Sequence, residues 1–68
     1  MPSDSELLFA LLAVRLGFVG REALKTPETA EDALAPAARA AVQAAVAAHI
    51  AQAKGDTAKA LAVVSALS

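Results

Sequence analysis

An almost uninterrupted apolar run occupies residues 7–19, near the start of the chain. Directly before it, Ser3 and Glu6 have the S-x-x-E spacing of a capping box, in which the serine hydroxyl accepts a hydrogen bond from the backbone N–H of the glutamate. Gly17 suits the left-handed position that commonly follows the end of a helix. The pattern therefore predicts a first helix from about residue 4 to residue 16.

The predicted first helix is apolar on nearly all of its faces. Its large apolar side chains include a stripe of Leu8, Leu12 and Leu16, with Phe9 on a neighbouring stripe. Only Arg15 interrupts them; we expect it either to lay its stem over the core edge or to pair with an acidic residue such as Glu22 of a neighbouring molecule. A helix of this kind must be covered on several sides, by other helices or by a partner. Phe18 and Val19 are expected to pack back onto it.

Two short elements are predicted in the middle of the chain. Residues 21–25 are expected to form a short second helix. Thr26 followed by Pro27 is typical of a helix start, with the threonine as cap and the proline at the first helical position. The segment 27–34 has Leu34 as its only large apolar residue, so it is either a single helical turn or a loop.

The longest predicted helix runs from Pro36 to Lys54, a stretch with no Gly and no further Pro. Its large apolar residues recur every four positions, as one face of a helix requires, at Val42, Val46 and Ile50. Most of the other residues are Ala, whose small side chains allow neighbouring helices to approach closely. We therefore expect this helix at the centre of the fold. Lys54 followed by Gly55 favours a helix end at that point.

A last helix is predicted from Thr57 to about Leu67, with Asp56 as its cap. Four to five helices with short connections make an all-α bundle the expected fold class. No segment alternates between apolar and polar residues with a period of two, so no sheet is expected. A chain of 68 residues holds one core, and we expect a single domain over residues 1–68.

Composition and charge narrow the classes of function. Twenty of the 39 apolar residues are Ala, and Cys is absent, which excludes a disulfide scaffold, a thiolate nucleophile and a Cys-based zinc site. Six basic and seven acidic residues, with no basic cluster, argue against nucleic-acid binding. The 7–19 run is too short to span a membrane and follows an acidic segment, unlike a signal peptide. We therefore expect a cytoplasmic protein.

The shortage of large apolar side chains suggests association. A chain this short, with nineteen apolar residues larger than Ala, is a candidate for gaining stability by binding a partner. We expect self-association or binding to another helical protein, through packing of the first helix and the Ala-rich helix. The expected partner-binding residues are Leu8, Phe9, Leu12, Arg15, Leu16, Phe18, Val42, Val46 and Ile50.

Two blocks of the chain carry distinctive motifs. The first block reads SELLFALLA at residues 5–13 and LGFVGREAL at 16–24, and the second includes VAAHI at 46–50 and KALA at 59–62. Together they resemble the N-terminal helical accessory region of planctomycete serine/threonine protein kinases. A Trp-containing helix usual in that region is replaced here by residues 25–32, as in a shortened, divergent member. The kinase motifs themselves are absent. The resemblance implies a non-catalytic module of a bacterial signalling system.

His49 is the one side chain that titrates near neutral pH. No nucleophile or orienting acid lies at a motif spacing from it, and a metal site would need two or three further ligands. We expect a histidine at the core edge, no cofactor or metal, and no enzymatic activity. The alternative is a small-ligand or metal-responsive regulatory protein centred on His49. The acidic cluster of Glu28, Glu31 and Asp32 is expected to be a solvated helix start.

Overall fold

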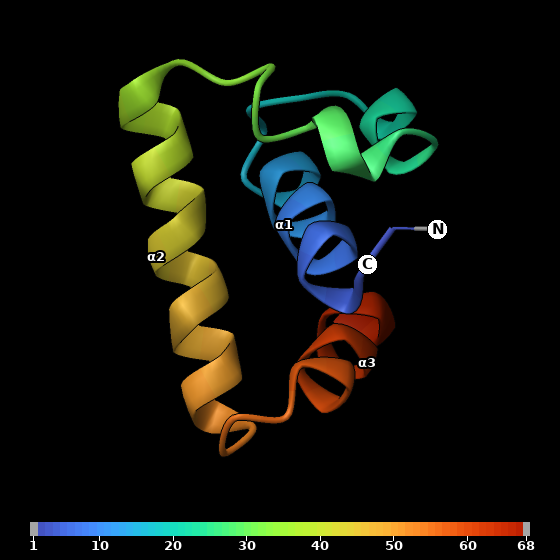
Figure 1. Ribbon diagram of the computed structural model, residues 1–68, viewed down its shortest axis with the longest axis vertical. Coiled ribbons are helices and arrows are strands. Elements are labelled where there is room, and N and C mark those ends of the chain that lie inside the picture. Colours follow the sequence, from blue (N-terminus) through green and yellow to red (C-terminus); the bar gives the residue numbers. More distant parts are fainter. Residues whose placement is uncertain (1, 68) are drawn as a thin grey trace.

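Three α-helices and two short 3₁₀ turns make up the computed structural model of the protein, which describes residues 2–67 (Figure 1). In chain order, the elements are α1 (Asp4–Arg15), η1 (Arg21–Leu24), η2 (Pro27–Thr29), α2 (Pro36–Gln52) and α3 (Thr57–Leu67). No strand occurs between residues 2 and 67. The predicted all-α class is confirmed.

The predicted number of four to five helices is wrong, because the middle of the chain forms only η1 and η2. Neither segment buries a large apolar face: Ala23 and Leu24 of η1 are only partly buried at the edge of the core, and η2 buries only Pro27. Isolated helices this short are unstable in water, and 3₁₀ turns are common in such connections. Thr26 also makes no side-chain capping bond; instead the Thr29 hydroxyl donates to the Thr26 carbonyl oxygen at 2.9 Å.

The ends of α1 are closed as the sequence predicts. The Ser3 hydroxyl accepts from the Glu6 N–H at 3.3 Å. At the other end, Gly17 has a φ of +85°, with its N–H donating to Val14 (3.0 Å) and the Phe18 N–H donating to Ala13 (2.9 Å). These two bonds are the Schellman pattern, which satisfies backbone carbonyls that the helix end leaves open.

The core is built around α1, which contacts both other helices and both 3₁₀ turns (Figure 1). The buried apolar residues are Leu8, Phe9, Ala10, Leu12 and Ala13 of α1, Ala30 and Leu34 of the connection, Val42 of α2, Ala53, and Ala60 and Val64 of α3. The expectation that the Ala-rich helix is central is therefore wrong. Ala offers little apolar area to bury, and Val42 is the one fully covered residue of α2.

The face of α2 that meets α1 carries the predicted stripe. Val42 is fully buried, whereas Val46 and Ile50 are half-buried and pack against the edge of the core. The helix ends at Gln52, two residues earlier than predicted. Lys54 itself takes the left-handed conformation, with a φ of +58°. The N–H of Lys54 donates to Ala51 at 3.0 Å, which closes this helix end.

The helix α3 is capped by Asp56, as predicted, since the Asp56 carboxylate accepts from the Lys59 N–H at 3.1 Å. Ala60 and Val64 face the core. At the far end, the Arg15 guanidinium donates from Nη1 to the Leu67 carbonyl oxygen at 2.9 Å. A cation suits the C-terminal end of a helix, where carbonyl groups lack intrahelical partners. This bond brings the C-terminal ends of α1 and α3 together.

Candidate functional site

The nine predicted partner-binding residues fall into three classes of burial. Leu8, Phe9, Leu12 and Val42 are buried within the chain, Val46 and Ile50 are half-buried, and Arg15, Leu16 and Phe18 are exposed. The four buried residues pack the helices together, so a partner can contact at most the small part of them that remains exposed. The remaining five lie on two separate parts of the surface.

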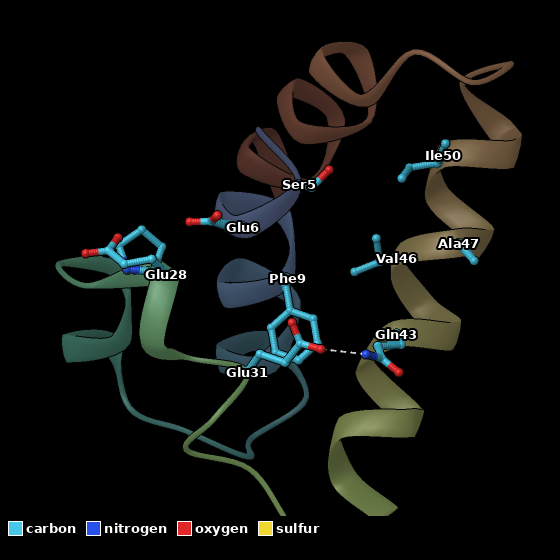
Figure 2. Close-up of a pocket in the computed structure, with 10 residues that line it drawn as sticks. Ser5, Glu6, Phe9, Glu28, Glu31, Gln43, Val46, Ala47 and Ile50 are labelled. Atoms are coloured by element: carbon cyan, nitrogen blue, oxygen red, sulfur yellow. Dashed lines mark hydrogen bonds between the residues drawn. The ribbon is translucent and has the colours of Figure 1, made fainter. Parts of the chain in front are cut away.

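The first part is a groove between α1, the η2 segment and α2, with a volume of about 290 Å³ (Figure 2). The residues that line it are Ser5, Glu6, Phe9, Pro27, Glu28, Glu31, Gln43, Val46, Ala47 and Ile50. Val46 and Ile50 point from α2 toward α1, the helix that carries Phe9 (Figure 2). We call this the α1–α2 groove. Its floor is apolar because α2 is too poor in large side chains to fill the space beside α1.

The rim of the α1–α2 groove is acidic. Glu6, Glu28 and Glu31 are among its lining residues, which include no Lys, Arg or His, and the Glu31 carboxylate points toward α2 (Figure 2). Glu28 and Glu31 are exposed, as expected for a solvated face. The groove therefore combines an apolar floor with negative charge at its edge, an arrangement suited to an apolar group flanked by cations.

One end of the groove is fixed by hydrogen bonds between α2 and the connection. The Gln43 side-chain amide donates to the Glu31 carboxylate at 2.7 Å (Figure 2). Arg39 donates from Nε to the Glu31 carbonyl at 3.1 Å and from Nη2 to the Leu34 carbonyl at 3.2 Å. Sequence reasoning missed these contacts, since nothing in the spacing of Arg39 and Gln43 points to a loop that precedes them in the chain.

The second part of the surface is a corner formed by Arg15, Leu16, Phe18 and Arg21, all of which are exposed; we call it the 15–21 corner. Leu16 keeps 50% and Phe18 44% of its surface exposed. The expectation that Phe18 packs back onto α1 is therefore wrong, whereas Val19 is half-buried and does pack against the core. The hydrogen bond from the Phe18 N–H to Ala13 turns the backbone back toward α1, but it leaves nearly half of the Phe18 surface exposed.

His49 is half-buried, as expected for the core edge, and lies beside a smaller hollow of about 180 Å³. Gln52, Lys59 and Val63 line the same hollow. Within residues 2–67, no three side chains of the His, Cys, Asp or Glu types are grouped so that they could hold a metal ion. Lys59 also brings a positive charge to the hollow, which disfavours a cation there.

Comparison of the chain with protein-family models, with curated proteins and with solved structures finds no match. The resemblance to the accessory region of kinases therefore stays a prediction. Between residues 2 and 67, no helix combines the length and the apolar character needed to cross a lipid bilayer.

Proposed function

We propose that this protein is a non-catalytic helical interaction module of a bacterial signalling system, acting in the cytoplasm and associating with itself or with another helical protein. The observation that carries the proposal is the α1–α2 groove. Phe9, Val46 and Ile50 line it, and Val46 and Ile50 are only half-buried within the chain. Grooves of this kind, between two helices, bind apolar side chains of a partner. The sequence resemblance to a region that precedes a kinase supports the signalling context.

The exposed apolar side chains set the expected strength of association. Leu16, Phe18, Val63 and Leu67 are each about half exposed, at 50%, 44%, 48% and 56%. Burying such a side chain fully is worth about 1.5–3 kcal/mol, so covering the exposed half contributes roughly 1 kcal/mol. A few such contacts, together with the groove floor, must also offset the loss of translational freedom. Because these gains are small, the association should be weak, and we take a dissociation constant between about 10 μM and 1 mM as the expected range.

The test is the mass in solution, measured by light scattering from about 10 μM to 1 mM, a range that brackets the expected constant. The average mass should rise above the 6.8 kDa of one chain as the concentration increases. A mass of 6.8 kDa at every concentration would overturn self-association.

Two neighbouring alanines of α2 provide a matched pair of variants. Ala47 and Ala48 are both exposed, but only Ala47 lines the groove. Ala47→Gln should weaken association at least tenfold, because a partner would have to desolvate the new amide. Ala48→Gln, with the same change in helix propensity, should associate like the unaltered protein. Equal behaviour of the two variants would show that the groove is not the binding surface.

A further inference from the structure

We propose that the α1–α2 groove receives the 15–21 corner of a second copy of the chain, with Phe18 as the anchor, so that copies join head to tail. The inference rests on the proposed function and names the occupant of its groove. Three properties of the two surfaces support it: size, charge and rigidity.

The size of the groove suits an aromatic side chain. A cavity of about 150 Å³ is enough to bind benzene, and drug-sized ligands occupy about 300–1,000 Å³. The groove, at about 290 Å³, lies between these cases and has room for one ring and a neighbouring aliphatic group. Phe18 and Leu16 supply both from a single turn of the chain, and each is about half exposed.

The charges of the two surfaces are opposite. Glu6, Glu28 and Glu31 line the groove, whereas the exposed Arg15 and Arg21 stand three residues before and three residues after Phe18 in the chain. The net charge of the whole chain is only −1, so the separation of charge is local. Opposite patches on one molecule favour docking of copies in a defined orientation and disfavour contact between like surfaces.

Both surfaces are held rigidly before they meet. Gly17, with a φ of +85°, and the bond from the Phe18 N–H to Ala13 fix the turn that carries the ring. The bond from Gln43 to Glu31 fixes one end of the groove. Because little ordering is required on docking, a modest apolar contact suffices for measurable association.

The groove and the corner lie on different parts of the molecule. The groove uses the N-terminal half of α1, through Ser5, Glu6 and Phe9, whereas the corner follows its C-terminal end. Leu16 follows Ser5 by eleven positions, about 16 Å along a helix at 1.5 Å per residue, so the two surfaces are distinct. A groove on one copy that binds the corner of the next generates a ring or an open chain.

The test mixes two variants that each lack one surface. Phe18→Asp removes the anchor and keeps the groove, whereas Ala47→Gln obstructs the groove and keeps the corner. At the same concentration, each variant alone should stay much closer to the monomer mass of 6.8 kDa in light scattering than the unaltered protein does. The average mass of an equimolar mixture should rise above that of either variant alone but should never exceed twice the monomer mass, because only one productive contact remains. Circular dichroism checks that both fold, and Phe18→Ser replaces Phe18→Asp if the aspartate variant does not.

The possible failures are distinguishable. If the unaltered protein stays monomeric, self-association itself fails. If the unaltered protein associates and the Phe18 variant associates equally well, the corner is not the occupant, and the proposed interaction function stands without this inference. If both variants are monomeric and their mixture is too, the two surfaces do not bind each other and the inference is overturned.

Discussion

Leucines on one stripe of α1 allow a direct test of the packing. Leu8 and Leu16 lie two helical turns apart, but Leu8 is completely buried whereas Leu16 is 50% exposed. Leu8→Ala removes buried apolar atoms and leaves a cavity, which costs about 3–4 kcal/mol at a site of this kind. Leu16→Ala loses roughly half the burial of one leucine and leaves no closed cavity, which costs about 1 kcal/mol.

The size of the fold makes this difference easy to detect. At about 0.05–0.15 kcal/mol per residue, a chain of 68 residues has a free energy of unfolding of roughly 3–10 kcal/mol. Leu8→Ala therefore removes a third or more of the total, and in the least stable case it unfolds the protein without denaturant. Leu16→Ala leaves the fold intact and should instead weaken association, since Leu16 belongs to the 15–21 corner.

The assay is urea unfolding followed by circular dichroism at about 1 μM protein, roughly tenfold below the lowest dissociation constant that we expect. For a domain this small the dependence on urea is about 1 kcal/mol per M, so the midpoint should fall by roughly 3 M for Leu8→Ala and 1 M for Leu16→Ala. Equal losses from the two substitutions, or a loss below about 1.5 kcal/mol for Leu8→Ala, would refute the placement of Leu8 at the centre of the core.

Three further predictions concern single residues. Gly17→Ala should lower the free energy of unfolding by about 1–2 kcal/mol in the same urea assay, because the φ of +85° is unfavourable for alanine although its Cβ would meet no atom within 4 Å. Lys54→Gly should raise the free energy of unfolding by about 0.5 kcal/mol, because Lys54 has a φ of +58°, which glycine adopts more easily than lysine. A loss of stability would contradict this prediction. Arg39→Lys should lower the free energy of unfolding by about 1 kcal/mol, because lysine lacks the planar guanidinium group that reaches both the Glu31 and Leu34 carbonyls. Because these two bonds hold the connection against α2 at the groove, light scattering should also show weaker association.

Local signals in the sequence determined where the helices begin and end. Ser3 with Glu6, Gly17 and Asp56 each act through hydrogen bonds or backbone angles that lie within four residues, so their spacing alone predicts them. The same kind of signal predicted too much helix in the middle of the chain. Thr26 and Pro27 can start a helix, but no tertiary contact extends it beyond one short turn.

The pattern of apolar residues gave the faces of the helices, but the tertiary structure decided how deeply each residue is buried. Val42, Val46 and Ile50 are equivalent in the sequence, yet of the three only Val42 is fully buried. The other two remain at the groove, because α2 supplies no further large side chains to close it.

The chemical character of the surface was decided by contacts between distant parts of the chain. The Arg15 guanidinium meets the carbonyl of Leu67, 52 residues away, and neither of the two roles expected for Arg15 anticipates that bond. Glu31 and Gln43, from the connection and from α2, meet at the groove only in the folded chain. Periodicity and capping describe each helix by itself, whereas the groove and the 15–21 corner exist only through the packing of α1 against its neighbours.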